Sequence, residues 1–128
     1  ITVKLKNPNE RSVFVKADKP KIEQVLINLI VNSINYGKEG GETLVRFYDM
    51  EDTLLIEVAD NGIGIAPDHL SRIFERFYRV DKSRSRHAGG SGLGLSIVKH
   101  IIDAHDQTIN VRSSPDMGST FSFTLQKD

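Results

Sequence analysis

The sequence contains no cysteine, so this 128-residue chain forms neither a disulfide nor a thiolate metal site. It has no excess of either charge: 17 basic residues balance 17 acidic ones, which argues against binding nucleic acid or an anionic membrane through overall charge. Its longest apolar run, residues 25–31, is interrupted by Asn28 and is too short to span a bilayer. The chain begins at Ile1 without a signal peptide, and we expect it to be one cytoplasmic domain (residues 1–128) of a longer protein whose other parts can include a membrane anchor.

The apolar residues alternate between the period of strands and the period of helices, which predicts a single α/β domain. The expected strands are residues 3–5, 13–15, 44–48, 54–59, 109–111 and 121–125. The first two are expected to pair with each other across a turn at 7–9. The expected helices run from Asp18, as the N-cap, to about Gly37, from Pro67 to Phe77, and from Leu93 to His105. We therefore expect a two-layer sandwich, in which three helices cover one face of a mixed, mostly antiparallel sheet of about five strands.

Three asparagines on the first expected helix form the first candidate site. At 100° per residue, Asn28, Asn32 and Asn35 fall within an arc of roughly 60°, away from the aliphatic side of the helix. An exposed helical face usually carries Glu, Lys or Gln, because Asn is a mediocre helix former. Amide oxygens are suitable ligands for Mg²⁺ when phosphates complete its coordination. We expect such a metal to arrive with a nucleotide, since neutral ligands alone hold it weakly.

The second candidate is the segment Asp60 to Ile65, which follows a strand-like run. An aspartate there can accept a hydrogen bond from the amine of adenine, whereas guanine presents an acceptor at the same position. Gly62 and Gly64 allow the backbone to come close to a flat base.

A second glycine cluster, Gly89 to Leu95, leads into the last expected helix. Free backbone N–H groups and the helix dipole favour phosphate at a helix N-terminus. The preceding segment, residues 76–92, holds five basic residues and one acidic residue, a composition suited to polyphosphate. Its flanking glycines lead us to expect a lid that closes over the ligand.

These segments resemble the catalytic ATP-binding domain of bacterial sensor histidine kinases, in the GHKL superfamily of gyrase, Hsp90, MutL and histidine kinases. The resemblance runs from about Asp18 to Leu125 and implies the Bergerat ATP-binding fold. Its motifs are an N box at 24–36, a G1 box at 60–65, an F box at 74–79, a G2 box at 90–99 and a closing strand element at 118–121.

The resemblance implies a site for ATP and Mg²⁺. Asn32 would be the chief metal ligand and catalytic residue, with Asn28 beside it, and Asp60 would read adenine. The other implied nucleotide-binding residues are Tyr36, Gly62, Gly64, Ile65, Phe74, Arg76, Phe77, Arg79, Gly90, Ser91, Gly92, Leu93, Gly94, Leu95 and Thr120.

Four positions depart from the family's pattern. Asn35 stands where most of these kinases have a lysine that reaches the phosphates, so one cationic contact is missing or comes from the lid. Asp106-Gln107 replaces a Gly-Gly turn, Asp116 replaces a glycine in the last hairpin, and Gly37 replaces a threonine or serine. None of the four is an expected metal, adenine or phosphate ligand, so we expect nucleotide binding to be retained.

Position 28 separates the branches of the superfamily. Relatives that hydrolyse ATP or phosphorylate serine have a glutamate there as general base, and Asn28 cannot accept a proton. A histidine acceptor needs no such base, because neutral imidazole is already nucleophilic near pH 7. None of the chain's own histidines, at positions 69, 87, 100 and 105, lies in the setting of an acceptor. We expect His100 and His105 to pack against or cap the last helix.

We therefore expect the chain to bind ATP and ADP and to pass the γ-phosphoryl group to a histidine on a separate dimerisation domain of the same protein. A response-regulator receiver domain would then take it. No nucleic acid and no direct membrane contact are expected. Two alternatives stay open: a GHKL-type ATPase module, which Asn28 disfavours, and a non-catalytic nucleotide-binding or docking domain, which Asn35 allows.

Overall fold

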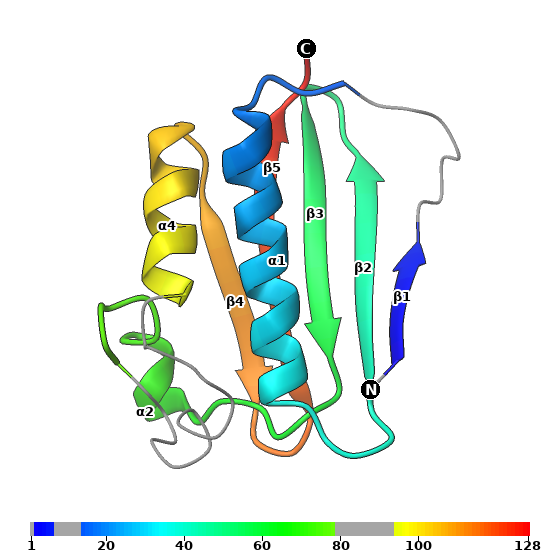
Figure 1. Ribbon diagram of the computed structural model, residues 1–128, viewed down its shortest axis with the longest axis vertical. Coiled ribbons are helices and arrows are strands. Elements are labelled where there is room, and N and C mark those ends of the chain that lie inside the picture. The colour runs from blue at the N-terminus through cyan, green and yellow to red at the C-terminus, as the bar shows by residue number, and fades with distance from the viewer. Residues whose placement is uncertain (1, 7–13, 79–93) are drawn as a thin grey trace.

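The computed structural model describes residues 2–6, 14–78 and 94–128, which contain one five-stranded sheet of order β1-β2-β3-β5-β4 (Figure 1). The strands are β1 Thr2–Lys6, β2 Glu42–Asp49, β3 Thr53–Asp60, β4 Ile109–Ser114 and β5 Gly118–Gln126. β1 runs parallel to β2, whereas the other neighbours pair antiparallel. The expected mixed, mostly antiparallel sheet of about five strands is thereby confirmed.

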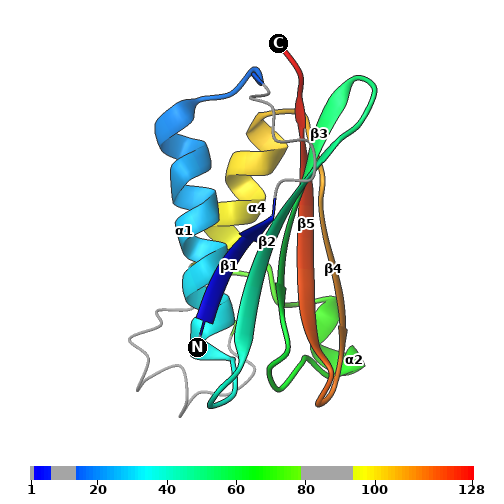
Figure 2. The same cartoon turned by 90° about the vertical axis from the view of Figure 1, so that its right-hand side faces the viewer.

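Two long helices form the second layer on one face of the sheet (Figure 2). They are α1 Lys19–Asn35 and α4 Gly94–Ala104, and they pack against each other. The side chain of Asp18 accepts a hydrogen bond from the backbone N–H of Lys21 at 3.3 Å, which confirms the expected N-cap of α1. A third, one-turn helix, α2 Pro67–Leu70, packs beside the edge strand β4. None of the helices in the described ranges is long and apolar enough to cross a membrane.

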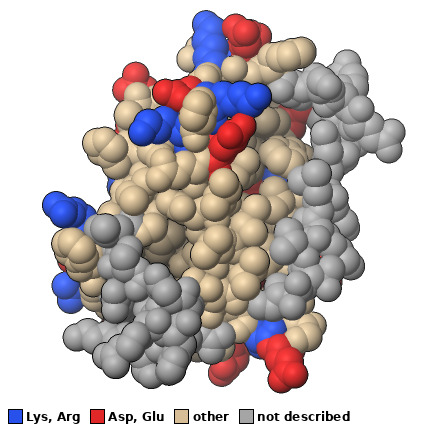
Figure 3. Space-filling view, viewed as in Figure 1, with Lys and Arg blue, Asp and Glu red and all other residues tan. Residues whose placement is uncertain are grey.

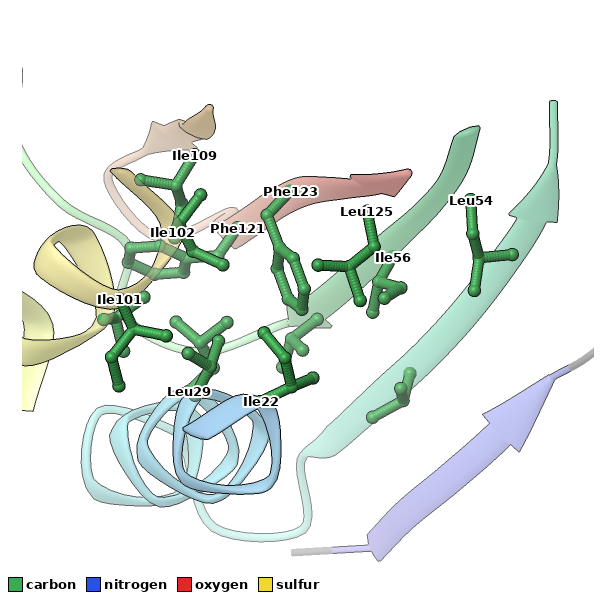
Figure 4. Close-up of a cluster of buried hydrophobic side chains, with 14 of the residues drawn as sticks. Ile22, Leu29, Leu54, Ile56, Ile101, Ile102, Ile109, Phe121, Phe123 and Leu125 are labelled. Carbon is green, nitrogen blue, oxygen red and sulfur yellow. The ribbon is translucent and has the colours of Figure 1, made fainter. Parts of the chain in front are cut away.

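The core lies between the helices and the sheet (Figure 4). Alternate residues of β5 point into it, because side chains of a strand alternate between the two faces. Among the residues whose burial the structure describes, the buried apolar ones are Ile22, Val25, Leu29, Val45, Leu54, Ile56, Val58, Ile73, Val98, Ile101, Ile102, Ile109, Phe121, Phe123 and Leu125. The packing of this core fixes the positions of α1, β3 and β5 relative to one another.

Two local expectations were wrong. The first strand was expected to pair with residues 13–15, but β1 pairs with β2, and Val15 instead forms a bridge with Lys127. The expected turn at 7–9 lies outside the described residues. The helix expected over residues 67–77 ends at Leu70 and continues as turns, in which Phe77 has a φ of 64°.

Candidate functional site

The loop of residues 60–65, which leads from β3 towards α2, is anchored to two other elements. The N–H of Ile63 donates to the carbonyl of Tyr36, directly after α1, at 3.2 Å. The N–H of Ile65 donates to the Oγ of Ser113 in β4 at 2.7 Å. These bonds hold the loop between the C-terminal end of α1 and the β4–β5 hairpin.

The two glycines of this loop sit where a side chain would collide with protein backbone. A Cβ at Gly62 would lie 2.2 Å from the carbonyl oxygen of Tyr36, and one at Gly64 would lie 2.0 Å from that of Ser114. Gly64 also has a φ of +72°, which favours glycine. The structure thus requires both glycines for close packing of the loop. Their approach to a base stays a prediction.

Asp60, the last residue of β3, is held by two backbone groups. Its Oδ1 accepts hydrogen bonds from the N–H of Gly62 at 2.9 Å and from the N–H of Ser119 at 3.3 Å. Burial raises the pKa of this carboxyl above 3.8, and the two hydrogen bonds offset part of that rise. No hydrogen bond from the residues that the structure describes reaches Oδ2. Asp60 therefore presents one oxygen of a positioned, partly desolvated carboxylate.

Ser119, rather than the predicted Thr120, lies beside Asp60. Ser119 is buried, and its Oγ lies 2.8 Å from the Oγ of Ser113 in the neighbouring strand. Thr120 is the next residue of the same strand, so its side chain points to the opposite face of the sheet. The expected alternation of Phe121, Phe123 and Leu125 already placed residue 119 on the helix side, which is the signal that could have found it.

The asparagines lie on a stretch of α1 that has no charge. Asn28, Asn32 and Asn35 are each half-buried, as is Tyr36. Residues 24–35 include no charged residue, and Figure 3 shows an uncharged surface over the middle of α1, with charges gathered towards its N-terminal end. No group of three or more His, Cys, Asp or Glu in the described ranges is placed to hold a metal. A cation here would depend on amide oxygens and on the ligand's own phosphates.

Asn28 is linked to the beginning of the other long helix. Its Nδ2 donates to the carbonyl oxygen of Gly94 at 3.3 Å. Gly94 is exposed and opens α4, and the next residue, Leu95, packs against the core. The structure thus brings the asparagine face of α1 next to the first turn of α4.

The F box is only partly directed inwards. Phe74 packs edge-on against Phe121, with ring centroids 6.2 Å apart. Phe77 was expected on the same apolar side, but 61% of it is exposed, and its φ of 64° shows that the helical conformation has ended before this residue. The guanidinium of Arg76 lies over the Phe77 ring, 5.1 Å from its centroid. The remaining predicted residues, Arg79, Gly90, Ser91, Gly92 and Leu93, and the expected lid lie outside the described residues.

A family model described as "Histidine kinase-, DNA gyrase B-, and HSP90-like ATPase" matches residues 17–128. The chain belongs to this family. Among curated proteins it is 42% identical over 123 residues to the sensor histidine kinase WalK of Bacillus subtilis, covering 94% of this chain and 20% of WalK. It is 47% identical over 111 residues to the sensor-like histidine kinase SenX3 of Mycobacterium tuberculosis, covering 87% of this chain and 27% of SenX3. The chain thus spans about a fifth to a quarter of these relatives.

Solved structures show the same relationship. The catalytic domain of the histidine kinase ThkA superimposes with a TM-score of 0.83 at 31% identity, covering 98% of this chain and 78% of that domain. Full-length ShkA in complex with AMPPNP gives a TM-score of 0.82 at 27% identity, over 99% of this chain and 26% of ShkA. ThkA in complex with the response regulator protein TrrA gives a TM-score of 0.78 at 30% identity, covering 98% of this chain and 34% of that chain. The expected resemblance to histidine kinase catalytic domains is confirmed.

Proposed function

We propose that this domain binds Mg²⁺-ATP and supplies the γ-phosphoryl group to a histidine on another domain of the same protein, in two-component signalling. The observation that carries the proposal is the geometry of Asp60. Backbone N–H groups of Gly62 and Ser119 fix its Oδ1, and its Oδ2 accepts no hydrogen bond from the described residues. An anionic acceptor in this state suits a ligand that brings its own N–H donor.

Adenine supplies that donor at its exocyclic amine, whereas guanine would place a carbonyl oxygen against the carboxylate. A hydrogen bond to a charged group is worth about 1.5–3 kcal/mol, or roughly ten- to a hundredfold in affinity. The half-buried position of Asp60 strengthens this discrimination, because an unpaired acceptor in a partly desolvated site is costly. We therefore assign base selectivity to Asp60.

Phosphates would extend from there along α1 towards the first turn of α4. The uncharged stretch 24–35 fits a phosphate-bound cation, because it offers neutral oxygens and no competing positive charge. Asn32 is the proposed ligand of that cation. When bound there, the cation would offset the negative charge of the phosphates. Backbone N–H groups at the beginning of α4 would face the same phosphates.

The acceptor histidine would come from outside this domain. Both ring nitrogens of His105 form hydrogen bonds, and Nδ1 of His69 forms a hydrogen bond with the hydroxyl of Tyr78. Asn28 cannot activate water as a general base, which favours transfer to histidine over hydrolysis. The ThkA complex with a response regulator supports a receiver domain as the next acceptor. We place the domain in the cytoplasm, where its nucleotide is available.

Calorimetry with ATP, ADP and GTP tests the nucleotide assignment. We expect the parent protein to bind ATP and ADP at least about tenfold more tightly than GTP, and Asp60→Ala to lose about tenfold in ATP affinity. Asp52→Ala, at the exposed β2–β3 turn, is the matched control and should bind as the parent does. Equal affinities for ATP and GTP in the parent, or equal ATP affinities in the two variants, would contradict the assignment.

A further inference from the structure

One side-chain hydrogen bond joins α1 to the N-terminal end of α4. The Nδ2 of Asn28 donates to the carbonyl oxygen of Gly94 at 3.3 Å, across 66 positions of sequence. Gly94 is the first described residue of α4, and apart from its chain neighbours and the backbone of its own helix, no atom of the described residues lies within 4 Å of the position of a Cβ there. The hydrogen bond from Asn28 is therefore a specific polar contact between α1 and the N-terminal end of α4.

The chemistry of this contact fixes the orientation of the amide. A carbonyl oxygen can only accept, so only the NH₂ group of Asn28 can face Gly94. The amide oxygen of Asn28 then points away from Gly94. An aspartate at this position would place an oxygen against the Gly94 carbonyl, and an alanine would leave the two helices without the contact.

We infer that Asn28 is a positioning residue, which holds the first turn of α4 against α1, rather than a ligand of Mg²⁺. The inference rests on the proposed function, in which backbone N–H groups of that turn face the phosphates and Asn32 holds the cation. It replaces the role beside Asn32 that the family resemblance implies for Asn28. The contact keeps the phosphate-binding turn in register with the metal-binding residue.

The first test needs no nucleotide. Amide exchange of residues 95–98 is compared among the empty parent, Asn28→Ala and Gln24→Ala. Gln24 lies one turn earlier on α1 and is exposed, so it is the matched control. We expect exchange in this turn to be about three- to tenfold faster in Asn28→Ala only, as loss of one hydrogen bond predicts. Unchanged exchange in Asn28→Ala, or an equal increase in both variants, would overturn the inference.

The second test separates positioning from metal ligation. ATP and adenosine affinities are measured across a Mg²⁺ titration for the parent, Asn28→Ala and Asn28→Asp. We expect Asn28→Ala to weaken the binding of ATP by about three- to tenfold. The affinity for adenosine and the midpoint of the Mg²⁺ titration should stay unchanged. A metal ligand would behave otherwise, because a carboxylate binds Mg²⁺ better than an amide does. A lower Mg²⁺ midpoint in Asn28→Asp, or a higher one in Asn28→Ala, would overturn the inference.

The two tests also distinguish this inference from the proposed function. Failure of the parent to bind ATP would contradict the proposed function, and amide exchange would still decide whether Asn28 holds α4. Normal ATP binding by the parent with unchanged exchange in Asn28→Ala would contradict the positioning role alone.

Discussion

The imidazole of His105 accepts a hydrogen bond from the backbone N–H of Asp18 at 3.0 Å, and so joins the C-terminal end of α4 to the N-cap of α1. Its Nδ1 lies 2.8 Å from the carbonyl oxygen of Ile101 and must be the donor to it. The two contacts specify one neutral tautomer, with the proton on Nδ1 and the lone pair on Nε2. This agrees with the capping role that the sequence suggested. It ties the two long helices together at the end opposite Gly94.

Replacing His105 should therefore destabilise the empty domain. We expect His105→Ala to lower the free energy of unfolding by about 1–2 kcal/mol, because two hydrogen bonds are removed. His100→Ala is the matched control: His100 is exposed on the same helix, and its loss should cost less than about 0.5 kcal/mol. Urea denaturation of both variants measures the difference, and equal losses would contradict a linking role for His105.

Two of the departures from the family pattern fall at left-handed backbone positions. Asp106, just after α4, has a φ of 57°, and Asp116, in the β4–β5 turn, has a φ of 64°. Glycine adopts this conformation without steric cost, and aspartate is among the few other residues that tolerate it. The structure thus explains both the glycines usual in the family and their replacement here by aspartate.

At position 116 glycine should be more stabilising than alanine, which reverses the usual order. We expect Asp116→Gly to exceed Asp116→Ala in free energy of unfolding by about 1 kcal/mol, because alanine pays the cost of a left-handed backbone. At Asp52, where φ is not positive, the Asp52→Ala variant should be more stable than the Asp52→Gly variant. Thermal or urea unfolding of the four variants checks the two orders. Alanine as the more stable residue at both positions would show that Asp116 is not strained.

Much of the fold could be predicted because its elements follow simple periods. The core residues of α1 and the alternating residues of β5 were read directly from spacing. The partner of β1 could not be predicted in this way, because parallel strands are not joined by a hairpin that would mark them as neighbours. Nothing in the local sequence indicates that β1 pairs with β2 rather than with residues 13–15. The early end of α2 was missed because apolar spacing continues through turns that bury Ile73 and expose Phe77.

The site was predicted at the level of segments more than of atoms. Asp60 ends β3 and the three asparagines lie on α1, as the sequence predicted, whereas their roles in binding adenine and Mg²⁺ stay predictions. Ser119 was not predicted, although the expected strand alternation puts residue 119 on the same face of the sheet as Asp60 and Thr120 on the opposite face. The contact of Asn28 with Gly94 could not be foreseen, because it depends on how α1 and α4 pack.

Asp60 should make the free energy of unfolding depend on pH, whereas asparagine at this position should not. Burial raises the pKa of Asp60 in the folded state above 3.8, so the folded protein retains this proton to a higher pH than the unfolded chain does. The contribution of Asp60 to stability therefore falls as pH rises from about 4 through the folded-state pKa. Asparagine keeps an oxygen for Gly62 and Ser119 and has no proton to lose. We expect the free energy of unfolding of Asp60→Asn, relative to the parent, to increase as the pH rises above about 4 and to level off once the pH exceeds the folded-state pKa of Asp60. Urea titrations at several pH values measure this, and a difference that decreases with pH would contradict the effect of burial.

Removing the proposed metal ligand should remove the effect of the metal. We expect the ATP affinity of the parent to rise at least about tenfold with Mg²⁺, and that of Asn32→Ala to be nearly independent of Mg²⁺. Gln24→Ala, on the exposed side of the same helix, should respond as the parent does. Calorimetry with and without Mg²⁺ decides this. An unchanged Mg²⁺ response in Asn32→Ala would place the metal elsewhere.

The central claim, transfer of the γ-phosphoryl group to a histidine on another domain, is tested most directly with γ-labelled ATP and Mg²⁺. The domain is incubated alone and with the histidine-bearing helical hairpin of its own full-length protein. Without the hairpin we expect neither self-labelling nor appreciable phosphate release. With it we expect acid-labile label on the hairpin's histidine, formed slowly because the covalent link between the domains is missing. Rapid phosphate release by the isolated domain, with no label on the hairpin, would contradict the account and indicate an ATPase.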